Sequence, residues 1–101
     1  MAKFDVYKNE NPHTNEKVPY LLDVQNDILK SLNTRVVIPL SRSNINFKGL
    51  TKEFTINDEK VYMLTSQMGS IFISKLIEKV CSLESQKEDI KNSIDFLIYG
   101  F

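Results

Sequence analysis

The order of the apolar segments is the feature that most constrains the fold of this chain. Short alternating or β-branched runs follow one another through most of the sequence, and one segment with helical spacing comes after them. Consecutive strands without helices between them pair antiparallel, because parallel neighbours need a long crossover connection. The order therefore predicts a mainly β protein, in which an antiparallel sheet or small barrel packs against one C-terminal helix.

The predicted strands are short and are separated by polar segments. They lie at residues 4–7, 18–24, 35–40, 54–56, 61–64 and 71–73. The Asn- and Pro-containing segment 8–17 predicts a long loop that joins the first two strands, and residues 57–60 predict a tight turn between two later strands. Segment 26–33 fits a loop or a short helical turn, and segment 41–52 a surface loop. Segment 76–83 fits either a strand or a single helical turn.

The C-terminal segment predicts an amphipathic helix. Ser85 and Glu88 have the spacing of a capping box, and Gly100 is a typical helix terminator. One face carries an apolar stripe, which consists of Ile90, Ile94, Leu97, Ile98 and Phe101. We expect part of this stripe to cover the sheet and part to contact a second copy of the chain.

Tyr99 falls on the polar face of this helix, near the chain end. Aromatic side chains dominate the energetics of binding surfaces, so Tyr99 is a candidate anchor for a partner. It could equally pack on a second subunit or simply lie on the surface, and periodicity alone does not decide between these interpretations.

Composition excludes several classes of protein. The 101 residues predict a single domain, and 13 basic residues against 13 acidic ones argue against nucleic acid or an anionic membrane as the main partner. One cysteine and one histidine exclude an internal disulfide and Cys- or His-rich metal sites. No apolar run is long enough to span a bilayer, and no signal-peptide core follows Met1. We therefore expect a cytoplasmic protein without a cofactor.

The residues with catalytic potential are isolated from one another in the sequence. His13 lies in the polar first loop, Cys81 lies between Val80 and Ser82, and no phosphate-binding or zinc-protease motif occurs. A solvated histidine and a structural thiol are the simpler interpretations. These observations favour a binding module over an enzyme.

Several motifs resemble the CcdB family of toxins from toxin–antitoxin modules, and the resemblance extends over essentially the whole chain. They are FDVY at 4–7, DVQNDI at 23–28, RVVIPL at 35–40, EDIKNSID at 88–95 and YGF at 99–101. The resemblance implies an SH3-like small antiparallel β-barrel with an extra small sheet and a C-terminal helix, a fold shared with MazF-type toxins. It also implies a homodimer.

The function implied by the resemblance requires no catalysis. Members of the family bind the A subunit of DNA gyrase and trap the cleaved DNA complex. A cognate CcdA-like antitoxin neutralises them through a disordered segment. The toxin–antitoxin complex represses its own operon, and the antitoxin supplies most of the DNA contact, so operator DNA is expected as a partner only through that complex.

The resemblance also implies a set of gyrase-binding residues. They are Ile28, Leu29, Asp95, Ile98, Tyr99, Gly100 and Phe101. Five of them depart from the family pattern: Tyr99 stands where the family has tryptophan, Asp95 where it has an amide, Ile98 where it has phenylalanine, and Leu29 and Phe101 where it has isoleucine. The first hairpin loop is longer than in the family and the 41–52 region is shorter.

Two alternatives remain open. A MazF-like endoribonuclease shares the barrel, and here Arg35, Arg42, Thr65 and Ser66 could take the roles of its arginine and hydroxyl groups. The zero net charge argues against the basic groove that RNA binding favours. The other alternative is a dimeric interaction domain that lacks toxicity, which the tyrosine at position 99 keeps open.

Overall fold

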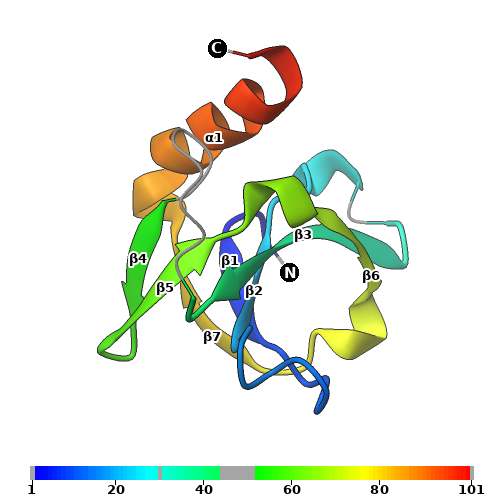
Figure 1. Cartoon of the computed structure of the whole chain (residues 1–101). Helices are drawn as coiled ribbons and strands as arrows, with labels where there is room; N and C mark the ends of the chain where they lie inside the picture. Colours follow the sequence, from blue (N-terminus) through cyan, green and yellow to red (C-terminus); the bar gives the residue numbers. More distant parts are fainter. Residues whose placement is uncertain (1, 30, 44–51, 101) are drawn as a thin grey trace.

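A computed structural model describes residues 2–29, 31–43 and 52–100. In this part of the chain, strands form one curled antiparallel sheet, and the C-terminal helix lies across one end of it (Figure 1). The strands are β1 (Asp5–Lys8), β2 (Tyr20–Asp23), β3 (Thr34–Ser41), β4 (Glu53–Ile56), β5 (Glu59–Met63), β6 (Gly69–Phe72) and β7 (Lys79–Ser82). The predicted mainly β class, an SH3-like small antiparallel β-barrel with a C-terminal helix, is confirmed, and the curled sheet forms a half-barrel.

The longest strand, β3, organises the sheet. The path through the sheet is β4-β5-β3-β2-β1-β7, and β6 pairs with β3 beside this path. The first half of β3 pairs with β6, from Thr34 opposite Phe72, whereas its end pairs with β5, where Leu40 lies opposite Met63. The β4–β5 hairpin therefore branches from the main curl. The expected small extra sheet is an arm of the same sheet.

The second hairpin turns where the sequence predicted. Asn57 and Asp58 both have positive φ, 52° and 63°, between the paired residues Ile56 and Glu59. Two successive left-handed residues form the hairpin turn whose twist matches that of the flanking strands, and Asn and Asp tolerate this conformation better than other residues with a side chain.

The core lies between the curled sheet and the first turns of the helix. Its fully buried members include Val6, Leu22, Ile38, Leu40, Val61, Met63 and Ile90. Ile90 therefore joins the helix to the barrel, and Ile94 packs partly buried beside it. Leu97 and Ile98, further along the predicted stripe, are exposed. The stripe covers the sheet only with its first half.

The helix α1 (Lys87–Tyr99) begins later than the capping box predicted. Ser85 lies instead in a preceding 3-10 turn, η4 (Glu84–Gln86), and the N-cap residue Gln86 makes no side-chain capping bond. The Leu83 amide donates to the Phe4 carbonyl, which holds the chain against the sheet. The capping-box prediction was wrong because this tertiary contact sets the start of the helix. Gly100 ends the helix as predicted, with a φ of 78°.

Other element boundaries differ in detail. The second strand begins at Tyr20 rather than at residue 18, and the predicted strand 71–73 ends at Phe72 because Ile73 starts a 3-10 turn, η3 (Ile73–Lys75). The two ambiguous segments are now assigned. Segment 26–33 contains a 3-10 turn, η1 (Asp27–Leu29), and segment 76–83 contains β7. Most of segment 41–52 lies outside the described residues.

Ser93 provides a test of this packing. The residue is 1% exposed, and its hydroxyl has no hydrogen-bond partner in the described part of the chain. A buried unsatisfied polar group typically costs about 1–3 kcal/mol. We expect Ser93→Ala to raise the free energy of unfolding by about 1 kcal/mol in urea denaturation. The exposed Ser85→Ala is the matched control, and a loss of stability in Ser93→Ala would contradict the packing.

Candidate functional site

The free end of α1 exposes a run of large apolar side chains. Phe96, Leu97, Ile98 and Tyr99 are all exposed, and Tyr99 reaches 64%. In Figure 1 the last turns of α1, after the buried Ser93 and the partly buried Ile94, project beyond the curled sheet. Clustered apolar side chains in water mark interaction sites in soluble proteins.

Helix geometry brings three predicted site residues together here. Asp95, Ile98 and Tyr99 are spaced i, i+3, i+4, so they lie on one face of the last turns of α1. Asp95 is half-buried and the other two are exposed. Gly100 follows in the left-handed conformation, and its amide donates a hydrogen bond of 2.9 Å to the Phe96 carbonyl, which ends the helix. Phe101 lies outside the described residues.

The other two predicted residues lie on a separate element. Ile28 and Leu29 belong to η1, between β2 and β3, and Ile28 is 84% exposed. In Figure 1, η1 (cyan) lies at the upper right of the sheet, below the free end of α1 (red). The predicted site thus consists of two apolar surfaces, one on the helix tip and one on η1.

A buried ion pair lies beneath η1, and the sequence analysis did not identify it. Arg35 is 1% exposed, and its Nε and Nη2 donate to the two carboxylate oxygens of Asp23 at 2.7 and 3.0 Å. Burial raises the pKa of Asp23, and the bond from Arg35 opposes that rise. For Arg35, burial acts to lower the pKa, but the bonds that it donates to Asp23 and the charge of that carboxylate raise it overall, so the guanidinium stays charged. The sequence did contain one indication of this pair, because Arg35 is a charged residue at the start of a β-branched strand.

Two of the four residues that could serve the endoribonuclease alternative are inaccessible. Arg35 and Thr65 are each 1% exposed, so a substrate outside the barrel cannot reach either side chain. Arg42 and Ser66 are exposed, and Arg42 pairs with Glu59. Burial also raises the pKa of the Cys81 thiol, which makes it a poorer nucleophile. Among the described residues, no group of three or more His, Cys, Asp or Glu could hold a metal.

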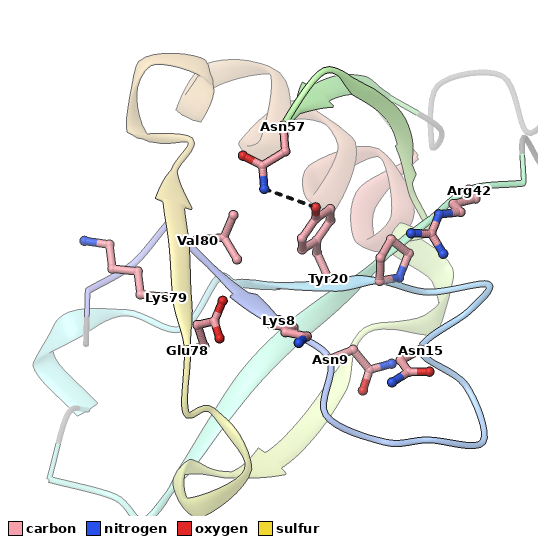
Figure 2. A pocket seen from close by; sticks show the side chains of 10 residues that line it. Lys8, Asn9, Asn15, Tyr20, Arg42, Asn57, Glu78, Lys79 and Val80 are labelled. Carbon is pink, nitrogen blue, oxygen red and sulfur yellow. Dashed lines mark hydrogen bonds between the residues drawn. The ribbon is translucent and has the colours of Figure 1, made fainter.

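A polar concavity of about 440 Å³ lies away from both apolar surfaces (Figure 2). It is lined by Lys8, Asn9, Asn15, Pro19, Tyr20, Arg42, Asn57, Glu78, Lys79 and Val80. The Asn57 amide donates to the Tyr20 hydroxyl across it at 3.5 Å, and Lys79 points away from it and pairs with Asp5 at 3.3 Å. None of the predicted site residues lines this concavity.

A larger groove of about 740 Å³ runs between the first hairpin loop and β6. Its wall includes Leu21, Ile71 and the exposed Phe72 and Ile77. The Ile73 amide donates to the Asn33 carbonyl at 3.0 Å, so the end of β6 adjoins the segment that follows η1. Phe72 was predicted only as part of the strand 71–73, so this surface was not predicted from the sequence.

The fold matches solved toxin structures. The Mycobacterium tuberculosis toxin MazF-mt6 superposes with a TM-score of 0.76 at 11% identity, over 93% of this chain and 95% of that one. An endoribonuclease from a mycobacterial species gives a TM-score of 0.73 at 11% identity, over 97% of this chain and 90% of that one. These matches define the fold class, which is the SH3-like half-barrel with a terminal helix found in MazF-like toxins.

Sequence comparison then identifies the family within this fold class. The family described as "CcdB protein" matches residues 3–100. The chain belongs to the CcdB family, and it is a toxin of the toxin–antitoxin class with an antitoxin as its partner. No helix in the described ranges is long and apolar enough to cross a membrane.

Proposed function

We propose that this protein binds the A subunit of DNA gyrase and traps the complex of gyrase with cleaved DNA. The observation that carries the proposal is the face of α1 on which the exposed Ile98 and Tyr99 lie beside the half-buried Asp95, in a chain of the CcdB family. A poison of this kind makes and breaks no bond. It binds one conformational state of gyrase more tightly than the others, so that this state accumulates. The protein is therefore not an enzyme, and it acts in the cytoplasm, where gyrase and DNA are found.

We propose that the toxin acts as a homodimer. Leu97 continues the apolar face of α1 that Ile90 and Ile94 place against the barrel, yet Leu97 is exposed. A second copy would cover it through a two-fold contact. We expect sedimentation equilibrium at micromolar concentration to give twice the 11.7 kDa chain mass, and Leu97→Asp to give a monomer. Lys91→Glu, on the exposed side of α1, is the control. A folded monomer of the unchanged protein would contradict the dimer.

In a two-fold dimer, the free ends of the two α1 helices can contact gyrase as a symmetric pair. If both tips lie near the axis, two Tyr99 rings meet a pair of equivalent residues on gyrase, whose A subunits are themselves a dimer. Arginine is the partner that fits best, because a guanidinium stacks on an aromatic ring and Asp95 supplies an opposite charge one helical turn away.

The antitoxin segment should compete with gyrase at η1. We propose that it binds in an extended or helical form over Ile28 and Leu29 and continues past the exposed Leu32 and Ile73 into the groove beside Phe72. Ile28→Ala is expected to weaken the binding of both partners, whereas Phe72→Ala should weaken only antitoxin binding. Competition measured by surface plasmon resonance checks this. A stable ternary complex with both partners on Ile28 and Leu29 would contradict it.

Binding and enzymatic assays test the proposal directly. Purified protein should bind the gyrase A subunit and inhibit supercoiling, and it should leave RNA intact. RNA cleavage that depends on the exposed Arg42 and Ser66 would favour the MazF-like alternative. Absence of gyrase binding and of growth arrest would favour the non-toxic interaction domain. Operator DNA should bind only when the antitoxin is present.

A further inference from the structure

Hydrogen bonds connect the η1 turn to the rest of the barrel. The Asp27 carboxylate, through Oδ1, accepts the Lys3 amide at 2.9 Å and Nη2 of Arg35 at 3.3 Å. Lys3 lies two residues before β1, and Arg35 lies in β3. One side chain of η1 thus connects the turn both to the N-terminal segment and to the sheet. The hydrogen bond from the Lys3 amide lowers the pKa of Asp27. Burial opposes this effect and the bond from Arg35 adds to it, so the pKa stays below its usual value and Asp27 is charged at neutral pH.

Gln25 adds a second set of hydrogen bonds between η1 and β3. Its buried side chain donates through Nε2 to the Leu29 carbonyl at 3.1 Å and accepts the Val36 amide at 3.1 Å. The same residue offers its carbonyl to Nη2 of Arg35 at 3.3 Å. The turn that presents Ile28 and Leu29 is therefore bound at both ends to β3 by side chains of the segment itself.

A contribution to folding stability does not by itself explain why the ion pair of Asp23 and Arg35 lies under η1. Replacing buried ion pairs with apolar residues is often neutral or stabilising, so such a pair is weak evidence for stability. In addition, Nη1 of Arg35 is buried and has no hydrogen-bond partner among the described residues. Arg35 does, however, fix the arrangement of Asp23, Gln25 and Asp27 around itself. It therefore connects the core to the exposed apolar turn.

We propose that Asp27 is a positioning residue, which holds η1 so that Ile28 and Leu29 are presented to gyrase in one fixed arrangement. The proposal rests on the proposed function of these two side chains. Ordering a mobile loop on binding reduces affinity, and a preordered loop avoids that loss. Asp27 itself, with a side chain 54% exposed, acts through the turn rather than through contact with the partner.

The first test compares two substitutions at Asp27. Asp27→Ala removes the acceptor and is expected to weaken binding to the gyrase A subunit about tenfold, as ordering two side chains on binding would. Asp27→Asn keeps an oxygen acceptor for the Lys3 amide and should restore most of that affinity. Glu53→Ala removes another exposed carboxylate, on β4, and should leave affinity unchanged. Equal binding by Asp27→Ala and the unchanged protein would overturn the proposal.

Two further measurements separate positioning from direct contact. In Asp27→Ala, hydrogen exchange at the Ile28 and Leu29 amides should accelerate at least about tenfold, while amides of β5 keep their protection. In an Ile28→Ala and Leu29→Ala background, Asp27→Ala should cause no further loss of affinity. A persisting tenfold loss there would show that Asp27 contacts gyrase itself and would overturn the positioning role.

The exchange measurement also separates this inference from the proposed function. If the unchanged protein does not bind gyrase, the proposed function fails, but the exchange of the Ile28 and Leu29 amides still reports on positioning. Faster exchange in Asp27→Ala would then support the tie between Asp27 and η1. Unchanged exchange would overturn it.

Discussion

Replacing Tyr99 with alanine is expected to weaken binding to the gyrase A subunit roughly 30- to 1000-fold, with little change in thermal stability. An aromatic anchor in a binding surface typically carries about 2–4 kcal/mol, and each 1.4 kcal/mol is a factor of ten in affinity. The side chain is 64% exposed, so its loss leaves no cavity in the barrel. Isothermal titration and a thermal melt on the same preparation check both halves of the prediction.

Two substitutions at the same position refine this prediction. Tyr99→Phe keeps the ring, and should retain most of the affinity if stacking dominates. Tyr99→Trp restores the family's larger ring and should bind at least as tightly as the unchanged protein. Deletion of residues 99–101 should abolish toxicity and leave the fold intact, because Ile90 and Ile94, nearer the N-terminus of α1, pack the helix against the sheet. Unchanged gyrase affinity in Tyr99→Ala would remove the anchor role, and a large loss of stability would assign Tyr99 to packing.

Replacing Arg35 with alanine is expected to lower the free energy of unfolding by about 3–5 kcal/mol. Asp23, fully buried, would then lose the cation that donates to both of its oxygens. An uncompensated buried carboxylate is costly, and the large side chain of Arg35 would also leave a cavity. Urea denaturation monitored by circular dichroism measures the effect.

A double-mutant cycle identifies the source of that loss. The combined Asp23→Ala and Arg35→Ala variant should be less destabilised than the sum of the two single variants, because neither charge is left alone. Arg42→Ala breaks the exposed pair with Glu59 and should leave stability nearly unchanged. Additive losses at Asp23 and Arg35 would contradict the pairing as the cause.

The fold could be predicted from the sequence where local patterns and tertiary packing agree. Alternation and β-branching located most of the strands, and the Asn57–Asp58 turn needed only the backbone preferences of its two residues. The start of α1 could not be predicted, because the contact between Leu83 and Phe4 is distant in sequence. The hydroxyl of Ser82 accepts the Glu84 amide at 3.2 Å, so a different serine from the predicted Ser85 supports the turn before the helix.

The candidate site could be predicted only in part. Helical periodicity singled out Tyr99, and family resemblance added Ile28 and Leu29, which the structure exposes on a separate turn. The buried pair of Asp23 and Arg35 escaped prediction because charge in a strand normally indicates a solvent-facing position. Pairing β2 with β3 in the observed register is what brings the two side chains together.

The central claim, that the protein acts by trapping gyrase on cleaved DNA, is tested most directly by a cleavage-complex assay. Purified toxin, gyrase, ATP and supercoiled plasmid are incubated, and the reaction is stopped with detergent and protease. We predict that linear plasmid accumulates with toxin concentration, that Tyr99→Ala shifts the required concentration upward at least 30-fold, and that the antitoxin abolishes the effect. Supercoiling that proceeds normally without linear product, at toxin concentrations that arrest growth, would contradict the account.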